Sequence, residues 1–357
     1  MPRNKQRGNG SGTVYPRKNK DGKIVSYLGS YFGPDGKRRY VSAKNKGECR
    51  EKLRAAMGEA DKGLVYNSSL RLGDYLDRWL EDSLKPTVRQ RTYERYESIV
   101  RVHIKPTLGR VKLKNLIRAQ VKSLYAIGSP RHTHITLHKA LNDAVADNLI
   151  PRNVADGLKP PKPRKEEINP LTPDQAKTFL EAARRDRFYA LYVLAIHYGL
   201  RQGELLGLKW EDVDLEKGTL QVRRTMSESR VGRIEERPKN GRGRRIDLSP
   251  SVADILAAQR ETHGSGELVF ATQKGTPVNS SNLVQRSFLP SLNSCGLPRI
   301  RFHDLRHTCA TIRSINGQHP KRVSEILGHS SVAITLDIYS HVIPGIGDDG
   351  DIFEGYC

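Results

Sequence analysis

A short proline-rich segment near the middle of the chain sets the strongest limit on its fold. Residues 159–165 read KPPKPRK, with prolines at positions 160, 161 and 163. Because proline lacks an amide hydrogen and holds φ near one value, neither a helix nor a central strand runs through such a segment. The 357 residues are therefore expected to form separate modules, two or three by length, joined by a stiff basic linker over 159–168.

Positive charge is concentrated before this linker. The sequence has 61 Lys and Arg against 39 Asp and Glu, a formal net charge of +22, and residues 1–160 carry +18 of it. A surplus of this size favours a polyanionic partner, above all nucleic acid, over a merely soluble basic surface. Nine further basic residues lie between Arg223 and Arg245.

Several protein classes are excluded by what the sequence lacks. It has no apolar run of about 18 residues, and the basic start MPRNKQRGNG is not followed by an apolar stretch, so we expect neither a membrane span nor a secretory signal. The four cysteines (Cys49, Cys295, Cys309 and Cys357) form no CxxC pair. We therefore expect no disulfide framework and no zinc ribbon, and we expect a reducing cytoplasm as the location.

The first module, residues 1–66, begins with a basic tail and continues with short strand-like pieces. These pieces span 12–15, 25–28, 30–32 and 39–41, with turn signals at 20–22 and 34–36, and a helical pattern follows over 45–60. The pattern predicts a three-stranded sheet plus one helix. A basic, aromatic β-ribbon can enter a DNA major groove, whereas an ordinary hairpin domain with solvated lysines is the alternative. The expected DNA contacts of this module are Arg17, Lys18, Lys20, Arg38 and Arg39.

The second module, residues 67–158, reads as helical throughout. Apolar stripes predict helices over 71–82 and 88–103, and further helices are expected over 115–126 and 132–149. Pro106 is expected to stop the second helix. The basic side chains expected to face DNA are Lys85, Arg89, Arg91 and Arg95.

The third module, residues 169–357 with a short acidic tail, mixes helices and strands. A helix cap at 172–174 and a buried helix over 187–199 are followed by strands near 219–224, 230–236 and 244–248, then by five further helices. These helices are expected over 251–262, 281–293, 303–315, 319–327 and 331–342. The fold class is therefore multidomain α+β, with helices around a small antiparallel sheet in this module.

Four segments of this module place polar residues beside apolar ones. They are YGLRQGELLGL (198–208), PKNG (238–241), FHDLRHT (302–308) and LGHSS (327–331), and Tyr339 follows His329 by ten residues. Each of these features taken alone could have a purely structural role. The chance occurrence of all five, the four segments and Tyr339, in this order is improbable.

These segments resemble the signature boxes of the tyrosine recombinases, the family of phage integrases. RQGELLGLKWEDVD (201–214), HDLRHTCAT (303–311) and LGHSSVAITLDIYSHV (327–342) match that family in order and spacing. The helical module and the basic front are also similar to those of large phage integrases. Segment 124–130 is shorter than usual in the family. The resemblance implies an arm-site-binding first module, a core-site-binding second module and a catalytic third module.

The residues fit the chemistry of that family. Opening a phosphodiester by attack of a side-chain oxygen requires cations on the phosphate, a nucleophile and a proton donor to the leaving 5′ oxygen. Guanidinium forks suit the phosphate oxygens, and imidazoles bind phosphate or move protons. The catalytic residues so assigned are Arg201, Lys239, His303, Arg306, His329 and Tyr339, with Glu204 as a supporting carboxylate. Lys239 is the expected general acid and Tyr339 the nucleophile.

Each assignment has a competing interpretation. Tyr339 shares a helical face with Val332 and Leu336, which is typical of a core residue. Arg242, near Lys239, is a second candidate for the general acid, and we also place Arg242 and Arg244 among the DNA contacts. His303 and His307 faintly echo the zinc motif HExxH, but the glutamate is missing and no third ligand is evident.

No metal, nucleotide or other cofactor is expected. Two arginines, one lysine and two histidines supply positive charge, a phosphotyrosyl bond conserves the energy of the cleaved bond, and the sequence has no GxxxxGK[ST] loop. The resemblance implies double-stranded DNA with core and arm sites as substrate, a tetramer on DNA, a DNA-bending host factor and a directionality factor. A Xer-type chromosome-dimer resolvase and a non-catalytic DNA-binding regulator are the alternatives.

Overall fold

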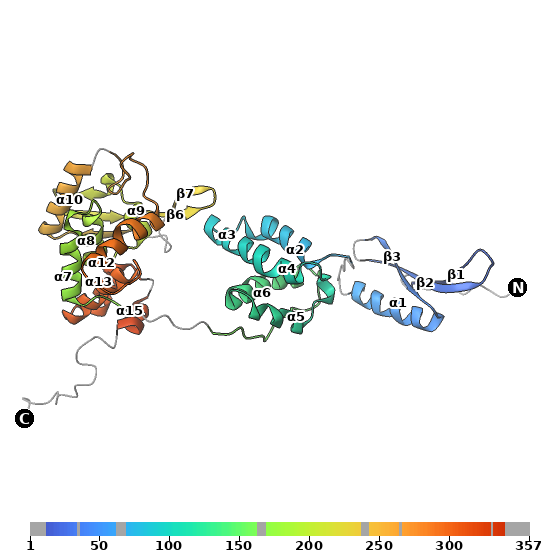
Figure 1. The fold of residues 1–357 in the computed structure, drawn as a ribbon. Helices are drawn as coiled ribbons and strands as arrows, with labels where there is room; N and C mark the ends of the chain where they lie inside the picture. The colour runs from blue at the N-terminus through green and yellow to red at the C-terminus, as the bar shows by residue number, and fades with distance from the viewer. Residues whose placement is uncertain are drawn as a thin grey trace, which may run out of the picture. The chain divides into compact units, whose positions relative to one another are not determined.

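The computed structural model describes residues 12–33, 36–61, 69–162, 169–236, 243–263, 266–329 and 331–339. The chain divides into two compact units, 1–164 and 165–357 (Figure 1). Helices and antiparallel strands occur in both units, so the predicted α+β class is confirmed. The finer division of the first unit into a sheet module and a helical module stays a prediction.

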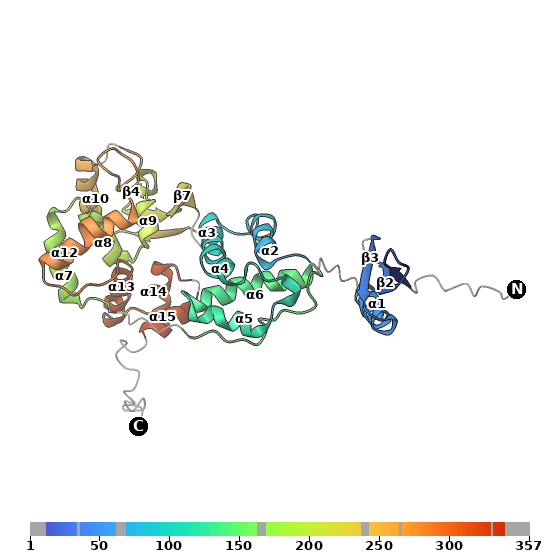
Figure 2. The same ribbon diagram turned by 45° about the vertical axis from the view of Figure 1, so that its right-hand side comes forward.

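The N-terminal sheet has the strand order β1-β2-β3, with β1 at Thr13–Lys18, β2 at Ile24–Phe32 and β3 at Arg38–Ala43. The two short pieces expected at 25–28 and 30–32 are one continuous strand, β2. Helix α1 (Lys46–Asp61) packs on one face of this sheet, as both ribbon views show (Figures 1 and 2). Gly29 permits the close approach, since a Cβ there would lie 3.3 Å from Leu53 of α1.

The opposite face of the sheet is open in this module. Strand register places Tyr15 beside Leu28 and Arg17 beside Ser26, and on the other edge it places Tyr40 beside Ser30. Because side chains alternate along a strand, the helix-free face combines exposed aromatic rings with cations. These side chains are Tyr15, Arg17, Phe32, Arg38 and Tyr40.

The helical part of the first unit runs from residue 72 to residue 146. Its α-helices are α2 (Leu72–Arg78), α3 (Gln90–Ile99), α4 (Lys105–Leu108), α5 (Arg118–Ser123) and α6 (Pro130–Ala146). Two π-helical turns, η1 (Trp79–Leu84) and η2 (Val100–Ile104), and two 3₁₀ turns, η3 (Leu113–Asn115) and η4 (Leu124–Ala126), connect them. The apolar stripes form one core. Two buried polar groups reach α6: the Tyr75 hydroxyl donates to the Ala140 carbonyl at 2.6 Å, and the Trp79 indole donates to Asp143 at 2.6 Å.

The prediction that Pro106 stops the second helix was wrong. The helical path continues through η2 into α4, and Pro106 occupies the first turn of α4. At that position the amide hydrogen needs no partner within the helix, so proline is accommodated.

The second unit contains most of the remaining helices. They are α7 (Pro173–Ala182), α8 (Tyr189–Tyr198), α9 (Gln202–Leu206), α10 (Pro250–His263), α11 (Ser280–Leu283), α12 (Leu289–Ser294), α13 (Asp304–Ile315), α14 (Pro320–Leu327) and α15 (Val332–Tyr339). Short turns η5 (Ala183–Arg185), η6 (Trp210–Asp212) and η7 (Val284–Phe288) join some of them. The predicted cap is confirmed: the Thr172 hydroxyl accepts from the amide of Gln175, and the Gln175 side chain accepts from the amide of Thr172.

Helix α8 forms the centre of this unit. All its side chains except Tyr189 and His197 are buried, as its apolar sequence predicted. Its Tyr192 ring contacts those of Phe179, Phe288 and Phe302, and the centroids in this aromatic cluster lie 5.2 to 6.4 Å apart. This core holds the ends of α8, α9 and α13 together, and these ends carry the polar signature segments.

The strands of this unit form two sheets instead of the single one expected. One has the order β4-β5-β8, with β4 at Val213–Asp214, β5 at Thr219–Val222 and β8 at Arg244–Asp247. The other is a hairpin of β6 (Thr225–Ser229) and β7 (Gly232–Glu236). Within the described residues, no helix is long and apolar enough to cross a membrane.

Candidate active site

Arg201 lies between two helices at a turn that requires glycine. Gly199 ends α8 with φ +63°, and a Cβ there would lie 2.2 Å from Cδ2 of Leu327. This turn directs the chain into α9 and leaves the Arg201 side chain 36% exposed. The combination of left-handed backbone and close packing explains why the signature segment reads Tyr-Gly-Leu-Arg at this point.

Glu204, one turn into α9, has a carboxylate that is almost completely buried, with 2% of the side chain exposed. It accepts from the Arg201 amide at 3.0 Å and from Arg201 Nη1 at 2.8 Å. Burial alone would raise its pKa, but hydrogen bonds and charge from Arg244, together with the charge of Arg201, lower the pKa to about 2. The carboxylate is therefore ionised at neutral pH and binds Arg201 through both its amide and its guanidinium.

Arg244, predicted as a DNA contact, has a different environment. Its side chain is only 14% exposed, and its guanidinium turns inward onto the Glu204 carboxylate at 2.8 and 3.1 Å. A DNA contact requires an outward, available cation, so this prediction is not supported for Arg244. Its position among nine basic residues offered no signal that its side chain turns inward.

Arg306 and two histidines come from α13 and the residue before it. Arg306 is buried, and its Nη1 donates to the Gly199 carbonyl at 2.7 Å. The rings of His303 and His307 pack edge to face, with centroids 5.1 Å apart. The end of α8 and the start of α13 thus hold each other in register at the site.

His329 follows α14 at a second left-handed turn. Gly328 has φ +65°, and its carbonyl accepts from Arg201 Nη2 at 3.2 Å. The Nδ1 of His329 shares a hydrogen with Thr335 Oγ1 of α15 at 2.9 Å, and Thr335 is buried. This contact ties the histidine to the helix that ends at Tyr339.

Both histidines are electrostatically coupled to the arginines. Partial burial, followed by the charges of neighbouring groups including Arg306 and Arg201, lowers the pKa of His303 and of His329 to about 4 each. The two rings are therefore neutral at pH 7 before any anion is bound. A phosphate bound beside the two arginines would favour the protonated forms of His303 and His329. The imidazoles can therefore take up a proton as the anion binds.

The structure thus gathers Arg201, His303, Arg306 and His329 in one place, from elements separated by more than 100 residues. Helix α15 packs against α13 and α14 and ends at Tyr339, whose side chain is outside the described part of the structure. Leu336, on the same helical face as Tyr339, is 40% exposed, which disfavours a purely core role for that face. Lys239 and Arg242 lie outside the described residues; β7 ends at Glu236 and β8 begins at Arg244.

A metal site is not apparent in the part of the chain that can be examined. Within the described residues, no three His, Cys, Asp or Glu side chains are placed to hold a metal ion. The HExxH-like spacing of His303 and His307 therefore has no third ligand among them.

The predicted DNA contacts of the first unit are mostly exposed. Arg17, Lys18, Lys20 and Arg38 are exposed in the sheet module, and Arg39 is half-buried on the face that carries α1. Lys85, Arg89, Arg91 and Arg95 are exposed in the helical part. Lys85 pairs with Glu81 and lies over the Tyr93 ring, whereas Arg95 lies over the Tyr96 ring.

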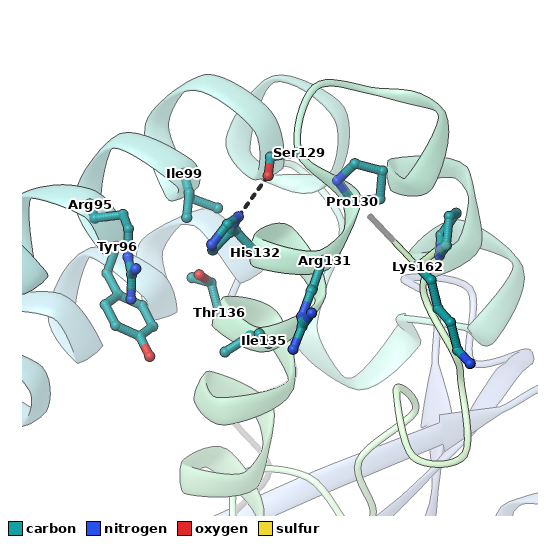
Figure 3. A pocket seen from close by; sticks show the side chains of 11 residues that line it. Arg95, Tyr96, Ile99, Ser129, Pro130, Arg131, His132, Ile135, Thr136 and Lys162 are labelled. Atoms are coloured by element: carbon teal, nitrogen blue, oxygen red, sulfur yellow. Dashed lines mark hydrogen bonds between the residues drawn. The ribbon is translucent and has the colours of Figure 1, made fainter. Parts of the chain in front are cut away.

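A pocket of about 440 Å³ lies between α3, the first turns of α6 and residues 161–162. Figure 3 shows its cationic side chains, Arg95, Arg131 and Lys162, around the less polar Tyr96, Ile99 and Ile135. Ser129 and His132 share a hydrogen at 2.8 Å at the start of α6. Sequence reasoning identified Arg95 here but missed Arg131 and Lys162 as members of the same basic surface.

Comparison with known proteins agrees with this arrangement. Residues 169–344 match the phage integrase family, and residues 71–125 match the phage integrase N-terminal SAM-like domain. A "Tyrosine recombinase XerC-like" protein of Caldanaerobacter subterraneus subsp. tengcongensis is 32% identical over 86% of this chain and 88% of its own length. The chain belongs to the phage integrase family of tyrosine recombinases. This recombinase is thus an enzyme that acts on DNA, as the signature segments predicted.

Solved structures of similar fold include two integrases. The Tn1549 transposon integrase in complex with a circular intermediate DNA has a TM-score of 0.67 at 22% identity, covering 76% of this chain and 95% of the other. A lambda integrase tetramer bound to a Holliday junction has a TM-score of 0.61 at 21% identity, covering 94% of this chain and 96% of the other. The second match covers a larger share of this chain than the first, 94% against 76%.

Proposed function

We propose that this recombinase is an integrase that cleaves DNA with Tyr339 and rejoins it through a 3′-phosphotyrosyl intermediate. The observation that carries the proposal is the convergence of Arg201, His303, Arg306 and His329 beside the helix that ends at Tyr339. Two guanidinium groups and two imidazoles around one point suit a single phosphate.

The arginines act on the phosphate. Arg201 is held by Glu204 and the Gly328 carbonyl, and Arg306 is held by the Gly199 carbonyl, so neither cation must reorganise when charge develops. Preorganised donors of this kind stabilise the charge that spreads over the non-bridging oxygens as Tyr339 attacks. The scissile phosphate sits against both guanidinium groups in this proposal.

The histidines and Lys239 move protons. A neutral His303 or His329 accepts a hydrogen bond or proton as the Tyr339 hydroxyl attacks, and the low pKa of each ring rises when the phosphate binds. Lys239 donates a proton to the leaving 5′ oxygen, with Arg242 as the second candidate. The phosphotyrosyl bond then conserves the energy for rejoining, so the reaction needs no nucleotide.

The basic surfaces of the first unit grip DNA. In the proposal the sheet module, 1–66, binds arm sites through its helix-free face, where Arg17 and Arg38 stand among Tyr15, Phe32 and Tyr40. The helical module, 67–158, binds the core site through Arg89, Arg91 and Arg95 and the cationic pocket of Figure 3. Contacts between such cations and the DNA phosphates contribute to affinity, and the number of these contacts determines how strongly the affinity depends on salt.

The assembly that fits this chemistry is a tetramer that holds two duplexes and passes through a Holliday junction. A lambda integrase of the same fold forms a tetramer on such a junction. Integration into, and excision from, a bacterial chromosome would then require a DNA-bending host factor and a directionality factor. A Xer-type resolvase is the second candidate because one relative is named XerC-like, but the basic sheet module favours an integrase.

A suicide substrate tests the proposal. A nicked core-site duplex that loses its short 5′ fragment traps the covalent protein–DNA adduct, which a denaturing gel detects. The wild type is expected to form the adduct, and Tyr339→Phe is expected to bind the same duplex without forming it, since only the hydroxyl is lost. Adduct formation by Tyr339→Phe would show that another residue is the nucleophile, and a wild type that binds but never cleaves would favour a non-catalytic regulator.

A further inference from the structure

Arg244, the first residue of β8, contacts separate parts of the active site at once. Its Nη1 and Nη2 donate to Oε1 and Oε2 of Glu204 at 3.1 and 2.8 Å, and its Nε donates to the Ile326 carbonyl at 3.0 Å. A planar guanidinium can satisfy a carboxylate and a carbonyl in this way, whereas the point charge of a lysine cannot. Arg244 thereby joins β8 to α9 and to the end of α14.

The same guanidinium lies against the turn that presents His329. A Cβ on Gly328 would be 3.1 Å from Nη1 of Arg244, 3.2 Å from its Cδ and 3.3 Å from its Cζ. Gly328 also has φ +65°, and its carbonyl accepts from Arg201. The turn from Ile326 to His329 is therefore held at the Ile326 carbonyl by Arg244 and at the Gly328 carbonyl by Arg201.

Glu204 stands between two cations. Its Oε1 accepts from Arg201 and Arg244, and its Oε2 accepts from the Arg201 amide and Arg244, so the buried carboxylate has four donors. A buried carboxylate must be neutralised, and with Arg201 as its sole charged partner it would bind that cation more tightly. Because Arg244 shares the negative charge, Arg201 retains net positive charge for an anion.

We propose that Arg244 is a positioning residue for strand cleavage: it holds Glu204 and the Ile326–His329 turn in the arrangement that presents Arg201 and His329 to one phosphate. Arg244 acts through these groups and does not itself contact DNA. The inference rests on the cleavage reaction proposed above, because it assigns Arg244 a part in that reaction.

The neighbouring residue provides a matched control. Arg245 follows Arg244 on β8, so its side chain points to the other face of the strand. It is 66% exposed and pairs with Asp247 at 3.0 Å, two residues along the same strand. An arginine removed at 245 changes the charge of the protein as much as one removed at 244, but it leaves Glu204 and Ile326 untouched.

The first experiment measures cleavage and binding separately. Single-turnover adduct formation on the suicide duplex and the dissociation constant for the intact duplex are compared for wild type, Arg244→Met, Arg244→Lys and Arg245→Met. Arg244→Met is expected to slow cleavage by about 10²-fold, the scale of a small misplacement of catalytic groups, with its dissociation constant within about twofold of wild type. The cleavage rate of Arg244→Lys should lie between those of wild type and Arg244→Met, since lysine restores the positive charge without the bidentate guanidinium. Arg245→Met should cleave at the wild-type rate.

Two results of this experiment would overturn the inference. One is cleavage by Arg244→Met at the wild-type rate. The other is a loss of DNA affinity that accounts for the whole loss of cleavage, which would make Arg244 a DNA contact. Absence of adduct from the wild type itself would instead refute the proposed function, so the two failures are distinguishable.

A second measurement separates positioning from a loss of folding. Removing Arg244 leaves the buried charge of Glu204 with one cation fewer. Arg244→Met is therefore also made in a Glu204→Gln background, in which that position carries no charge. If Arg244 acts through Glu204, the effects of the two substitutions are not additive, because the two side chains are in contact. The fold loss in cleavage rate caused by Arg244→Met should then be at least tenfold smaller in the Glu204→Gln background than in the wild type. An equal loss in both backgrounds, with thermal unfolding of the Glu204→Gln and double variants alike, would overturn the inference.

Discussion

Replacing Gly199 by alanine tests how closely the end of α8 packs against the active site. The new Cβ would lie 2.2 Å from Cδ2 of Leu327, which is completely buried and has little room to move. The backbone at Gly199 is left-handed with φ +63°, which costs a residue with a Cβ about 1–2 kcal/mol. Overpacking adds about 1–3 kcal/mol, so Gly199→Ala should lower the free energy of unfolding of the second unit by about 2–5 kcal/mol.

Gly317 is the matched control. It follows α13 with φ +69°, and a Cβ there would meet nothing within 4 Å. Gly317→Ala should therefore cost only the backbone part, about 1–2 kcal/mol. The difference between the two variants isolates the contact with Leu327.

Urea unfolding followed by tryptophan fluorescence measures both values. The chain has two tryptophans, Trp79 in the helical part and Trp210 in the second unit. In a Trp79→Phe background the signal reports the second unit alone, which avoids mixing two unfolding transitions. Equal destabilisation by Gly199→Ala and Gly317→Ala would refute the packing argument. Because the Gly199 carbonyl accepts from Arg306, Gly199→Ala should also slow cleavage, whereas Gly317→Ala should not.

Three further predictions concern the cations, pH and the sheet module. Arg201→Ala and Arg306→Ala should each slow adduct formation by roughly 10²–10³-fold, the scale of one preorganised donor, while duplex affinity in gel shifts hardly changes; a matching drop in affinity would make them ordinary backbone contacts. The lowered pKa values of His303 and His329 mean that the unfolded chain binds more protons between about pH 4 and pH 6.5, so stability should fall as the pH drops through that window. Urea titrations across this range should give the free energy of unfolding of the Trp79→Phe protein with and without the pair His303→Gln and His329→Gln. The free energy should change less steeply with pH when both histidines are replaced, and an identical slope would contradict the pKa assignment. Deleting residues 1–62 should leave core-site cleavage intact, abolish efficient integration and flatten the salt dependence of arm-site binding; full integration by the truncated protein would show that the module only aids solubility.

Local structure was largely predictable because it depends on short-range chemistry. The Thr172 cap, the buried helix α8 and the alternation of strands and turns before residue 45 all follow from patterns within a few residues. Pro106 shows the limit of such reasoning. A proline disrupts a helix interior, but sequence alone does not reveal that a π-helical turn makes its position the start of a new segment.

The family and the nature of the reaction were also determined by sequence, since the signature segments keep their order and residue types. What only the tertiary structure decided is how those residues are supported. Arg244 and Arg245 are adjacent and chemically identical, yet the first is only 14% exposed and binds Glu204 and Ile326, while the second is 66% exposed and pairs with Asp247. The difference arises because β8 pairs with β5 and presents one face to α9 and to the end of α14, contacts between segments 40 and 82 residues apart. The sequence specifies the charge of each residue, but the packing of distant elements determines which group each charge contacts.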